Sequence, residues 1–237
     1  MKKRLSRLLA VCAVLLVLCA GAFGLYVSDY SRAEPAALAL AAQAQTQGRY
    51  TTLAPTGQDT GVGVVFYPGG KVEAAAYLPL LQQLAEQGWL CISVKMPCYM
   101  AFFGINAADE LRAAYPQVEN WYIGGHSLGG AMAASYAAKH NDALSGLVLL
   151  ASYSTADLSR SDLPVCSIYG SRDTVLNAES YAQNRSNLPA NTTELVIEGG
   201  NHAGFGAYGP QKKDGIAAIT AAEQQKITAN HILGFYN

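Results

Sequence analysis

The chain has 237 residues, of which 51% are hydrophobic, and its formal net charge is −1. This length is ample for one large core and short for two, and no internal repeat or low-complexity tract indicates a solenoid or a disordered protein. Basic residues do not cluster beyond the N-terminus, so the composition argues against nucleic-acid binding.

The first 29 residues predict a membrane-spanning segment. Four basic residues within the first seven precede an uncharged run over residues 8–28, which ends at Asp29. As a helix, a run of 21 residues rises about 30 Å, the hydrocarbon thickness of a bilayer. Basic residues before a span favour a cytoplasmic N-terminus, so the remaining chain is expected outside the cytoplasm. Residues 19–22 also offer a small-residue cleavage site, and cleavage there would make the protein a secreted one.

Residues 30–54 are expected to be a helical stalk or linker. The run over 30–48 is rich in alanine and leucine, which have high helix propensity, and Gly48 is a stop signal. An edge strand could follow over residues 49–55. The globular domain is then expected over residues 55–237.

From residue 62 onward, apolar strand-like runs alternate with helix-like runs. Strands are expected over residues 62–67, 89–95, 118–124, 146–151, 165–169 and 194–198. Helices are expected over residues 73–87, 107–114, 128–140, 175–187 and 214–235. This alternation predicts an α/β fold with a doubly wound, mostly parallel sheet covered on both faces. The loops at the carboxyl ends of its strands are expected to form the functional site.

The first of these strands leads into the glycine-rich loop Pro68-Gly69-Gly70-Lys71. Backbone N–H groups on such a loop can stabilise the oxyanion of an acyl-transfer reaction. Pro68 has no N–H, so Gly70 is the expected donor and Lys71 is the alternative. An ordinary Pro-Gly turn between a strand and a helix would give the same pattern.

The stretch NWYIGGHSLGGAM at residues 120–132 predicts a strand, a very tight turn and a helix. A serine on such a turn is held in strained backbone geometry with its hydroxyl exposed, and the flanking glycines leave room around it. Ser127 is therefore the candidate nucleophile, and the N–H of Leu128 is the other expected oxyanion donor. The pattern G-x-S-x-G is weak by itself, and a glycine-rich turn that only packs closely is the alternative.

A serine nucleophile needs a base, and the base needs a group that orients it. Of the four histidines, His202 lies on a glycine-rich loop directly after a strand-like run. Asp173 follows the strand-like run over 165–169 in the same way. A solvent-exposed loop histidine and a helix N-cap are the alternative roles of these two residues. Weaker candidates for the acid are Asp142, Asp157 and Asp162.

These motifs resemble the α/β-hydrolase superfamily, and more narrowly its small bacterial carboxylesterase-like and dienelactone-hydrolase-like members. The resemblance covers residues 60–235 and rests on PGGKV at 68–72, Met96-Pro97, GGHSLGGAM at 124–132, YGSRD at 169–173 and GGNHAGFGAYG at 199–209. It implies a catalytic triad of Ser127, Asp173 and His202, which occur in the chain order of these enzymes. Many relatives have His-Gly where this chain has Pro68-Gly69. The cysteine nucleophile of true dienelactone hydrolases is absent.

Little chain is available for a lid over the site. Only residues 152–164 separate the two strands that follow the nucleophile helix, so the cleft is expected to be open and to suit small or exposed acyl groups. Six loop aromatics could line an apolar pocket there: Tyr99, Phe102, Phe103, Tyr153, Phe205 and Tyr208.

The sequence implies no cofactor and no metal, because the cysteines and histidines lack a zinc-like spacing. Cys91 and Cys166 fall in strand-like runs, where a free thiol is a common core residue. A disulfide between Cys91 and Cys98 is the alternative.

The sequence therefore predicts a serine hydrolase that cleaves an ester or thioester of a small or acylated substrate through an acyl-enzyme. Two rival interpretations remain. A cell-envelope acyltransferase would use the same residues, and a membrane-tethered binding protein would keep the fold without the chemistry. The oligomeric state does not follow from the sequence.

Overall fold

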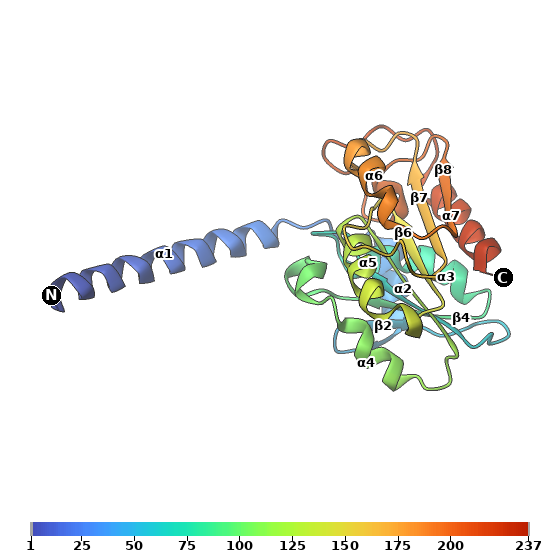
Figure 1. Ribbon diagram of the computed structural model, residues 1–237, viewed down its shortest axis with the longest axis horizontal. Helices are drawn as coiled ribbons and strands as arrows, with labels where there is room; N and C mark the ends of the chain where they lie inside the picture. Colours follow the sequence, from blue (N-terminus) through green and yellow to red (C-terminus); the bar gives the residue numbers. More distant parts are fainter. Residues whose placement is uncertain (1, 237) are drawn as a thin grey trace. The chain divides into compact units, whose positions relative to one another are not determined.

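The computed structural model describes residues 2–236, which divide into two units after Tyr30 (Figure 1). The first unit is helix α1 (Lys2–Ser28). Its segment Leu9–Ser28 is 20 residues long, is apolar, and has none of its residues buried. This helix is therefore long and apolar enough to cross a membrane.

The second unit is built on one eight-stranded sheet with the strand order β1-β2-β4-β3-β5-β6-β7-β8. The first two strands, β1 (Gln45–Gln47) and β2 (Tyr50–Leu53), pair antiparallel, and β2 is antiparallel to β4. The other strands run parallel: β3 (Val62–Tyr67), β4 (Trp89–Val94), β5 (Asn120–His126), β6 (Gly146–Leu150), β7 (Val165–Gly170) and β8 (Thr192–Ile197). The expected mostly parallel α/β sheet is confirmed.

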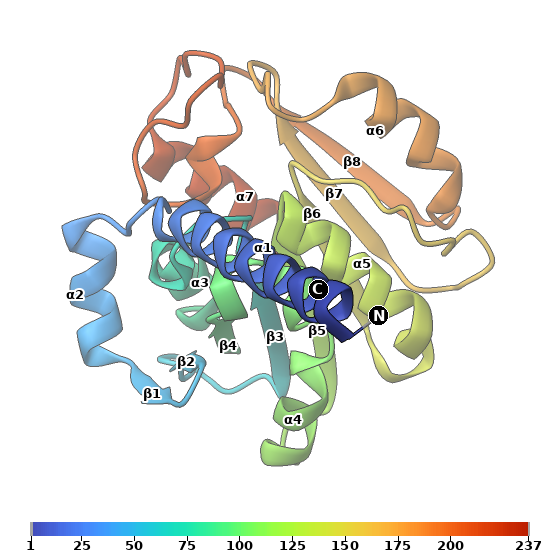
Figure 2. The same ribbon diagram turned by 90° about the vertical axis from the view of Figure 1, so that its left-hand side faces the viewer.

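Helices cover both faces of this sheet, which explains why its central strands are apolar throughout (Figure 2). Helices on one face are α2 (Pro35–Gln43), α3 (Leu78–Ala85) and α7 (Ala221–Tyr236). Helices on the other face are α4 (Ala107–Ala114), α5 (Leu128–His140) and α6 (Ala178–Asn184). Residues 151–164, between β6 and β7, hold no helix or strand, so the chain has no large lid at this position.

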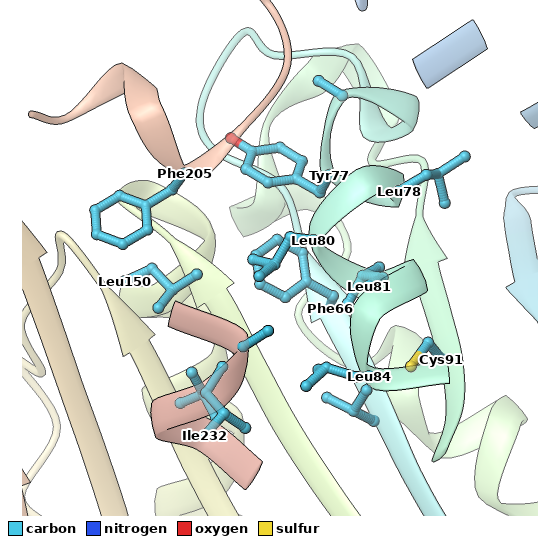
Figure 3. Close-up of a cluster of buried hydrophobic side chains, with 14 of the residues drawn as sticks. Phe66, Tyr77, Leu78, Leu80, Leu81, Leu84, Cys91, Leu150, Phe205 and Ile232 are labelled. Carbon is cyan, nitrogen blue, oxygen red and sulfur yellow. The ribbon is translucent and has the colours of Figure 1, made fainter. Parts of the chain in front are cut away.

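The larger apolar cluster lies between the sheet and α3 (Figure 3). Leu80, Leu81 and Leu84 of α3 are at most 2% exposed, and they pack with Phe66 of β3 and Ile232 of α7. Their spacing places three leucines on one side of a short helix, which is why this segment folds against the sheet. The cluster reaches Tyr77 and Phe205 at its upper end in Figure 3, next to the carboxyl ends of the strands.

Some element boundaries differ from those expected. The helix expected over 214–235 begins only at Ala221, the first residue of α7, because Thr220 and Glu223 form a reciprocal cap there. The Thr220 N–H donates to the Glu223 carboxylate (2.8 Å), and the Glu223 N–H donates to the Thr220 hydroxyl (3.2 Å). Residues 210–220 are consequently a loop, and part of the site depends on it.

The expected stalk is instead packed into the second unit. Ala37 of α2 is completely buried, and the Glu34 N–H donates to the carbonyl oxygen of Ala207 (2.8 Å). The strand expected over 49–55 is β2, which lies one strand inside the sheet edge because β1 pairs with it. Helical propensity could not distinguish a free helix from one that buries small alanines against a core.

This packing gives a direct test of where α2 belongs. We expect Ala37→Asp to lower the free energy of unfolding by roughly 3–5 kcal/mol, because it buries a carboxylate with no partner. Leu38→Asp changes the neighbouring residue of the same helix, where the side chain is 44% exposed, and should cost less than about 1 kcal/mol. Thermal unfolding of the detergent-solubilised chain measures both. Equal effects would mean that α2 does not pack on the sheet in solution.

Candidate active site

Ser127 lies between the end of β5 and the start of α5 in a backbone conformation that few residues adopt. Its φ and ψ angles are 51° and −122°. Two glycines make the turn possible: a Cβ on Gly125 would lie 2.5 Å from the carbonyl carbon of Gly129, and one on Gly129 would lie 2.1 Å from the Tyr67 carbonyl oxygen. Sterics therefore require the two glycines of GHSLG at this strand-to-helix turn.

Three hydrogen bonds hold the Ser127 backbone in this conformation. Its N–H donates to the carbonyl oxygen of Leu150 on the neighbouring strand β6 (2.9 Å). Its own carbonyl oxygen accepts from the Ser152 hydroxyl (2.8 Å) and from the N–H of Ala131 (3.1 Å). The strain at this residue is thus sustained by the surrounding sheet and helix.

The structure brings Asp173 and His202 together from two loops that follow β7 and β8. His202 Nδ1 lies 2.8 Å from Asp173 Oδ2, and the two side chains are only 2% and 1% exposed. Asp173 Oδ1 accepts from the N–H groups of Val175 (2.9 Å) and Leu176 (2.8 Å). A buried carboxylate with these partners holds the proton on Nδ1 and leaves Nε2 as the basic nitrogen. The capping role considered for Asp173 and the pairing with His202 therefore coexist on its two oxygens.

Ser127 and His202 line the same cavity, which has a volume of about 360 Å³. Within the described residues no hydrogen bond joins the Ser127 hydroxyl to His202, and such bonds often form only when substrate binds. The cavity walls are mainly apolar: Leu128, Ala131, Met132, Tyr153, Val175 and Leu176. Of the six aromatics expected near the site, Tyr153 lines this cavity, whereas Phe205 and Tyr208 are core residues.

Gly70 lies against the side chain of Leu128, the residue that follows Ser127. A Cβ on Gly70 would approach the Leu128 Cδ2 to 3.1 Å, and within residues 2–236 neither N–H donates a hydrogen bond. The N–H of Lys71, the alternative donor, is already bonded to the Tyr99 carbonyl oxygen (2.8 Å). Of the three expected donors in the described chain, Gly70 and Leu128 therefore keep an unpaired N–H, which an oxyanion site requires.

Backbone strain is concentrated at this edge of the sheet. Six described non-glycine residues have a positive φ, and five of them follow the carboxyl ends of β3 to β6: Lys71, Cys98, Tyr99, Ser127 and Ala151. Such conformations cost about 1–3 kcal/mol each and gather where a site needs a particular geometry. The strained residues therefore lie in the same loops as the sequence motifs that predict the site.

Sequence reasoning missed the residues that hold the His202 loop. The Asp214 carboxylate accepts from the N–H groups of His202 (3.2 Å) and Ala203 (2.8 Å). The side chain of Gln224 on α7 accepts from the Asn201 N–H (3.0 Å) and donates to the Asn201 carbonyl oxygen (2.8 Å). Asp214 was hidden because its segment was expected to be helical. Gln224, completely buried on α7, is an exception to the polar exterior of a helix.

A second histidine lies directly behind the first. The ring centroids of His126 and His202 are 4.5 Å apart, and His126 is 1% exposed. The Tyr77 hydroxyl accepts from the Gly69 N–H (3.1 Å) and forms a second hydrogen bond with His126 Nδ1 (2.8 Å). Tyr77 and His126 thus connect the loop carrying Gly70 to the ring of His202. Burial, followed by the nearby His202, holds the pKa of His126 well below its usual value.

Cys91 and Cys166 are buried free thiols and Cys98 is an exposed one, so the alternative disulfide does not form. Among the described residues, no group of three or more His, Cys, Asp or Glu side chains could hold a metal ion.

Known proteins share this fold. The model described as "Alpha/beta hydrolase family" matches residues 63–226. No curated protein matches the sequence. Similar solved structures include MGS-MChE2, an alpha/beta hydrolase enzyme from the metagenome of sediments of the Mar Chica lagoon in Morocco, with 15% identity and a TM-score of 0.61 over 81% of this chain and 97% of that one.

Two further structures cover similar shares. Est1E from Butyrivibrio proteoclasticus has 14% identity and a TM-score of 0.60, over 81% of this chain and 97% of that one. The monoacylglycerol lipase of Paleococcus ferrophilus has 12% identity and a TM-score of 0.62, over 80% of this chain and 100% of that one. At these identities the likeness shows the fold alone.

The Tyr77 hydroxyl can be tested by its removal. We expect Tyr77→Phe to lower the free energy of unfolding by about 1–3 kcal/mol, because the Gly69 N–H and His126 Nδ1 both lose a buried partner. Tyr122→Phe is the matched control, since the Tyr122 hydroxyl makes no hydrogen bond within the described residues, and it should cost less than about 0.5 kcal/mol. Denaturant titration measures both changes, and a neutral Tyr77→Phe would contradict the arrangement.

The lowered pKa of His126 makes stability depend on pH. The unfolded imidazole binds a proton near pH 6.5 and the folded one does not, so the unfolded state gains stability as the pH falls. We expect the free energy of unfolding to decrease below about pH 6.5, by up to about 1.4 kcal/mol per pH unit for this group. His231, whose pKa burial also lowers, adds a contribution of the same sign. In His126→Gln the free energy of unfolding should depend less steeply on pH. An unchanged dependence would mean that other groups cause the effect.

Proposed function

Because this chain belongs to the alpha/beta hydrolase family, we propose that it is a serine hydrolase that cleaves a carboxylic ester or thioester through an acyl-enzyme intermediate. Ser127 is the proposed nucleophile, His202 the base and Asp173 the residue that orients the base. Gly70 and Leu128 are the proposed oxyanion donors.

One observation carries this proposal. The buried Asp173–His202 pair, with 2.8 Å between Oδ2 and Nδ1, opens onto the cavity that the strained Ser127 also lines. Burying a carboxylate together with an imidazole costs desolvation free energy, and the attraction between the two groups offsets that cost poorly. A purely structural role therefore explains this pair poorly. Orienting a base beside a serine supplies a reason for the pair.

In the proposed reaction, His202 Nε2 takes the proton of the Ser127 hydroxyl while the serine oxygen attacks the substrate carbonyl carbon. The Asp173 carboxylate stabilises the imidazolium that forms, and the N–H groups of Gly70 and Leu128 bind the carbonyl oxygen as it becomes negative. The bond to the alcohol or thiol then breaks, and the leaving group takes the proton from His202. Water, activated by the same nitrogen, releases the acid and restores Ser127.

His126 supports this scheme by staying neutral. A protonated His126, with its ring centroid 4.5 Å from that of His202, would repel the imidazolium that forms during attack. Burial keeps the proton off His126, so no second positive charge lies beside the one that develops on His202, which the Asp173 carboxylate stabilises.

The cavity supports a short acyl group or one that lies along the surface. With no helical lid between β6 and β7, the apolar wall of Met132, Val175 and Leu176 is accessible from solvent. We propose that α1 stays attached and holds the catalytic unit outside the cytoplasm, since four basic residues precede its apolar segment.

The proposal is tested with a fluorophosphonate probe and a small p-nitrophenyl ester. We expect Ser127→Ala to abolish labelling and to reduce ester hydrolysis by about 10⁴-fold or more, because the nucleophile is lost. Ser135→Ala is the matched control on helix α5, where the hydroxyl only donates to the Ala131 carbonyl oxygen (2.9 Å), and it should retain both activities. Labelling that persists in Ser127→Ala would disprove the assignment.

A further inference from the structure

The chain joins the second unit beside the proposed oxyanion loop. Ser31, the first residue of that unit, forms a parallel bridge with Val72. Its N–H donates to the carbonyl oxygen of Lys71 (2.7 Å), and its carbonyl oxygen accepts from the N–H of Glu73 (2.9 Å). Residues 71–73 directly follow Gly70, so Ser31 is fixed by backbone hydrogen bonds to the loop that carries the oxyanion donor.

The next residues of the chain strengthen this attachment. The Glu73 carboxylate accepts from the N–H of Ala33 (2.9 Å), and the Glu34 N–H is bonded to the carbonyl oxygen of Ala207 (2.8 Å). Ala207 lies in the loop that begins at His202. The start of the catalytic unit is therefore tied both to the oxyanion loop and to the loop of the base.

Only Asp29 and Tyr30 connect the apolar helix to this point. Helix α1 ends at Ser28, and three successive Cα–Cα steps cannot exceed about 11 Å. Adjacent paired chains add roughly 5 Å between Ser31 and the oxyanion loop. Whatever direction α1 takes, the distance from its end to the oxyanion loop is therefore no more than the thickness of about two headgroup layers, each about 5–8 Å thick. A helix that spans the bilayer therefore keeps the oxyanion loop close to the lipid headgroups.

The loop over residues 210–220 presents suitable side chains at the same edge of the sheet. Its Asp214 carboxylate bonds the His202 N–H, and the Gly215 carbonyl oxygen accepts from the Asn201 side chain (2.8 Å). Lys212 and Lys213 are exposed, and Ile216 is 86% exposed. Two cations and an apolar side chain on one loop fit a surface of acyl chains and anionic headgroups.

We propose that the substrate is an ester of a membrane-resident amphiphile, whose acyl chain lies in the bilayer and whose carbonyl group lies at the membrane surface. This inference rests on the proposed hydrolase function and on α1 as a membrane anchor. The short connection delivers the catalytic groups to the depth at which such an ester is exposed. The acyl chain then stays in the bilayer and needs no burial in the protein, so an open cavity without a lid is sufficient.

The test lengthens the connection in the full chain, reconstituted in phosphatidylcholine and phosphatidylglycerol vesicles. Four EAAAK repeats inserted between Asp29 and Tyr30 add a semi-rigid helical spacer of about 30 Å. The substrates are a long-chain 1-acylglycerol placed in the bilayer and membrane-permeant p-nitrophenyl acetate, assayed on the same vesicles. We expect the spacer to reduce hydrolysis of the acylglycerol at least tenfold and to leave that of the acetate within twofold.

The matched control adds the same 20 residues before Met1, which changes length and composition but not the connection, and it should hydrolyse both esters at the original rates. A spacer variant that hydrolyses the acylglycerol at the original rate would overturn the inference while leaving the hydrolase intact. Loss of both activities only in the spacer variant would also count against it, because the spacer would then act on folding. An unmodified chain that hydrolyses neither ester would refute the proposed function itself.

A second variant tests the loop without altering the connection. Replacing Lys212 and Lys213 by glutamate should lower acylglycerol hydrolysis about tenfold in vesicles rich in phosphatidylglycerol and much less in pure phosphatidylcholine, because only the anionic surface repels the new charges. Hydrolysis of p-nitrophenyl acetate should not change. If this variant hydrolyses the acylglycerol equally fast in the two lipid mixtures, the loop does not face the membrane.

Discussion

The whole site depends on the backbone of one residue. Ser127 can hold a φ of 51° only because β6 accepts its N–H, Ser152 donates to its carbonyl oxygen, and glycines at 125 and 129 leave space for the turn. The same turn starts α5 at Leu128, whose side chain lies against Gly70. Parallel pairing of β3, β5 and β6 thereby positions both the proposed nucleophile and the proposed oxyanion donors.

Burial of the Asp173–His202 pair is the second constraint, and its polar groups are well satisfied. Each oxygen of Asp173 has a partner, and Asp214 and Gln224 hold the backbone of the His202 loop from behind. With only one of these partners, the buried Asp173 carboxylate would lower the stability of the fold, because its desolvation would not be offset. The loop over 210–220 therefore has a structural purpose at the site even though no residue in it is proposed to touch the substrate.

The sequence predicted what local patterns determine. The bounds of β3, α4 and α5 agree with expectation, because each is framed by clear apolar periodicity and by glycine or polar stops. Ser127, Asp173 and His202 were selected by their positions after strands, and that placement does not depend on side-chain packing. By contrast, the partners of His126 and the role of Asp214 required contacts between residues 12 to 49 positions apart. The stalk was misjudged because Ala37 looks the same in a free helix as in a buried one.

The loop over residues 69–73 joins three parts of the molecule that are otherwise separate. Gly69 bonds Tyr77 and through it reaches His126, Gly70 faces Leu128, and Lys71 to Glu73 hold Ser31. Lys71 is strained, with a φ of 58°, and backbone hydrogen bonds hold it on two sides, from Tyr99 and from Ser31. The loop that carries the proposed oxyanion donor is consequently fixed by the same hydrogen bonds that hold Ser31, where the chain enters the second unit. Releasing Ser31 would free one side of this strained residue, so the attachment of the chain and the geometry of the site are properties of a single loop.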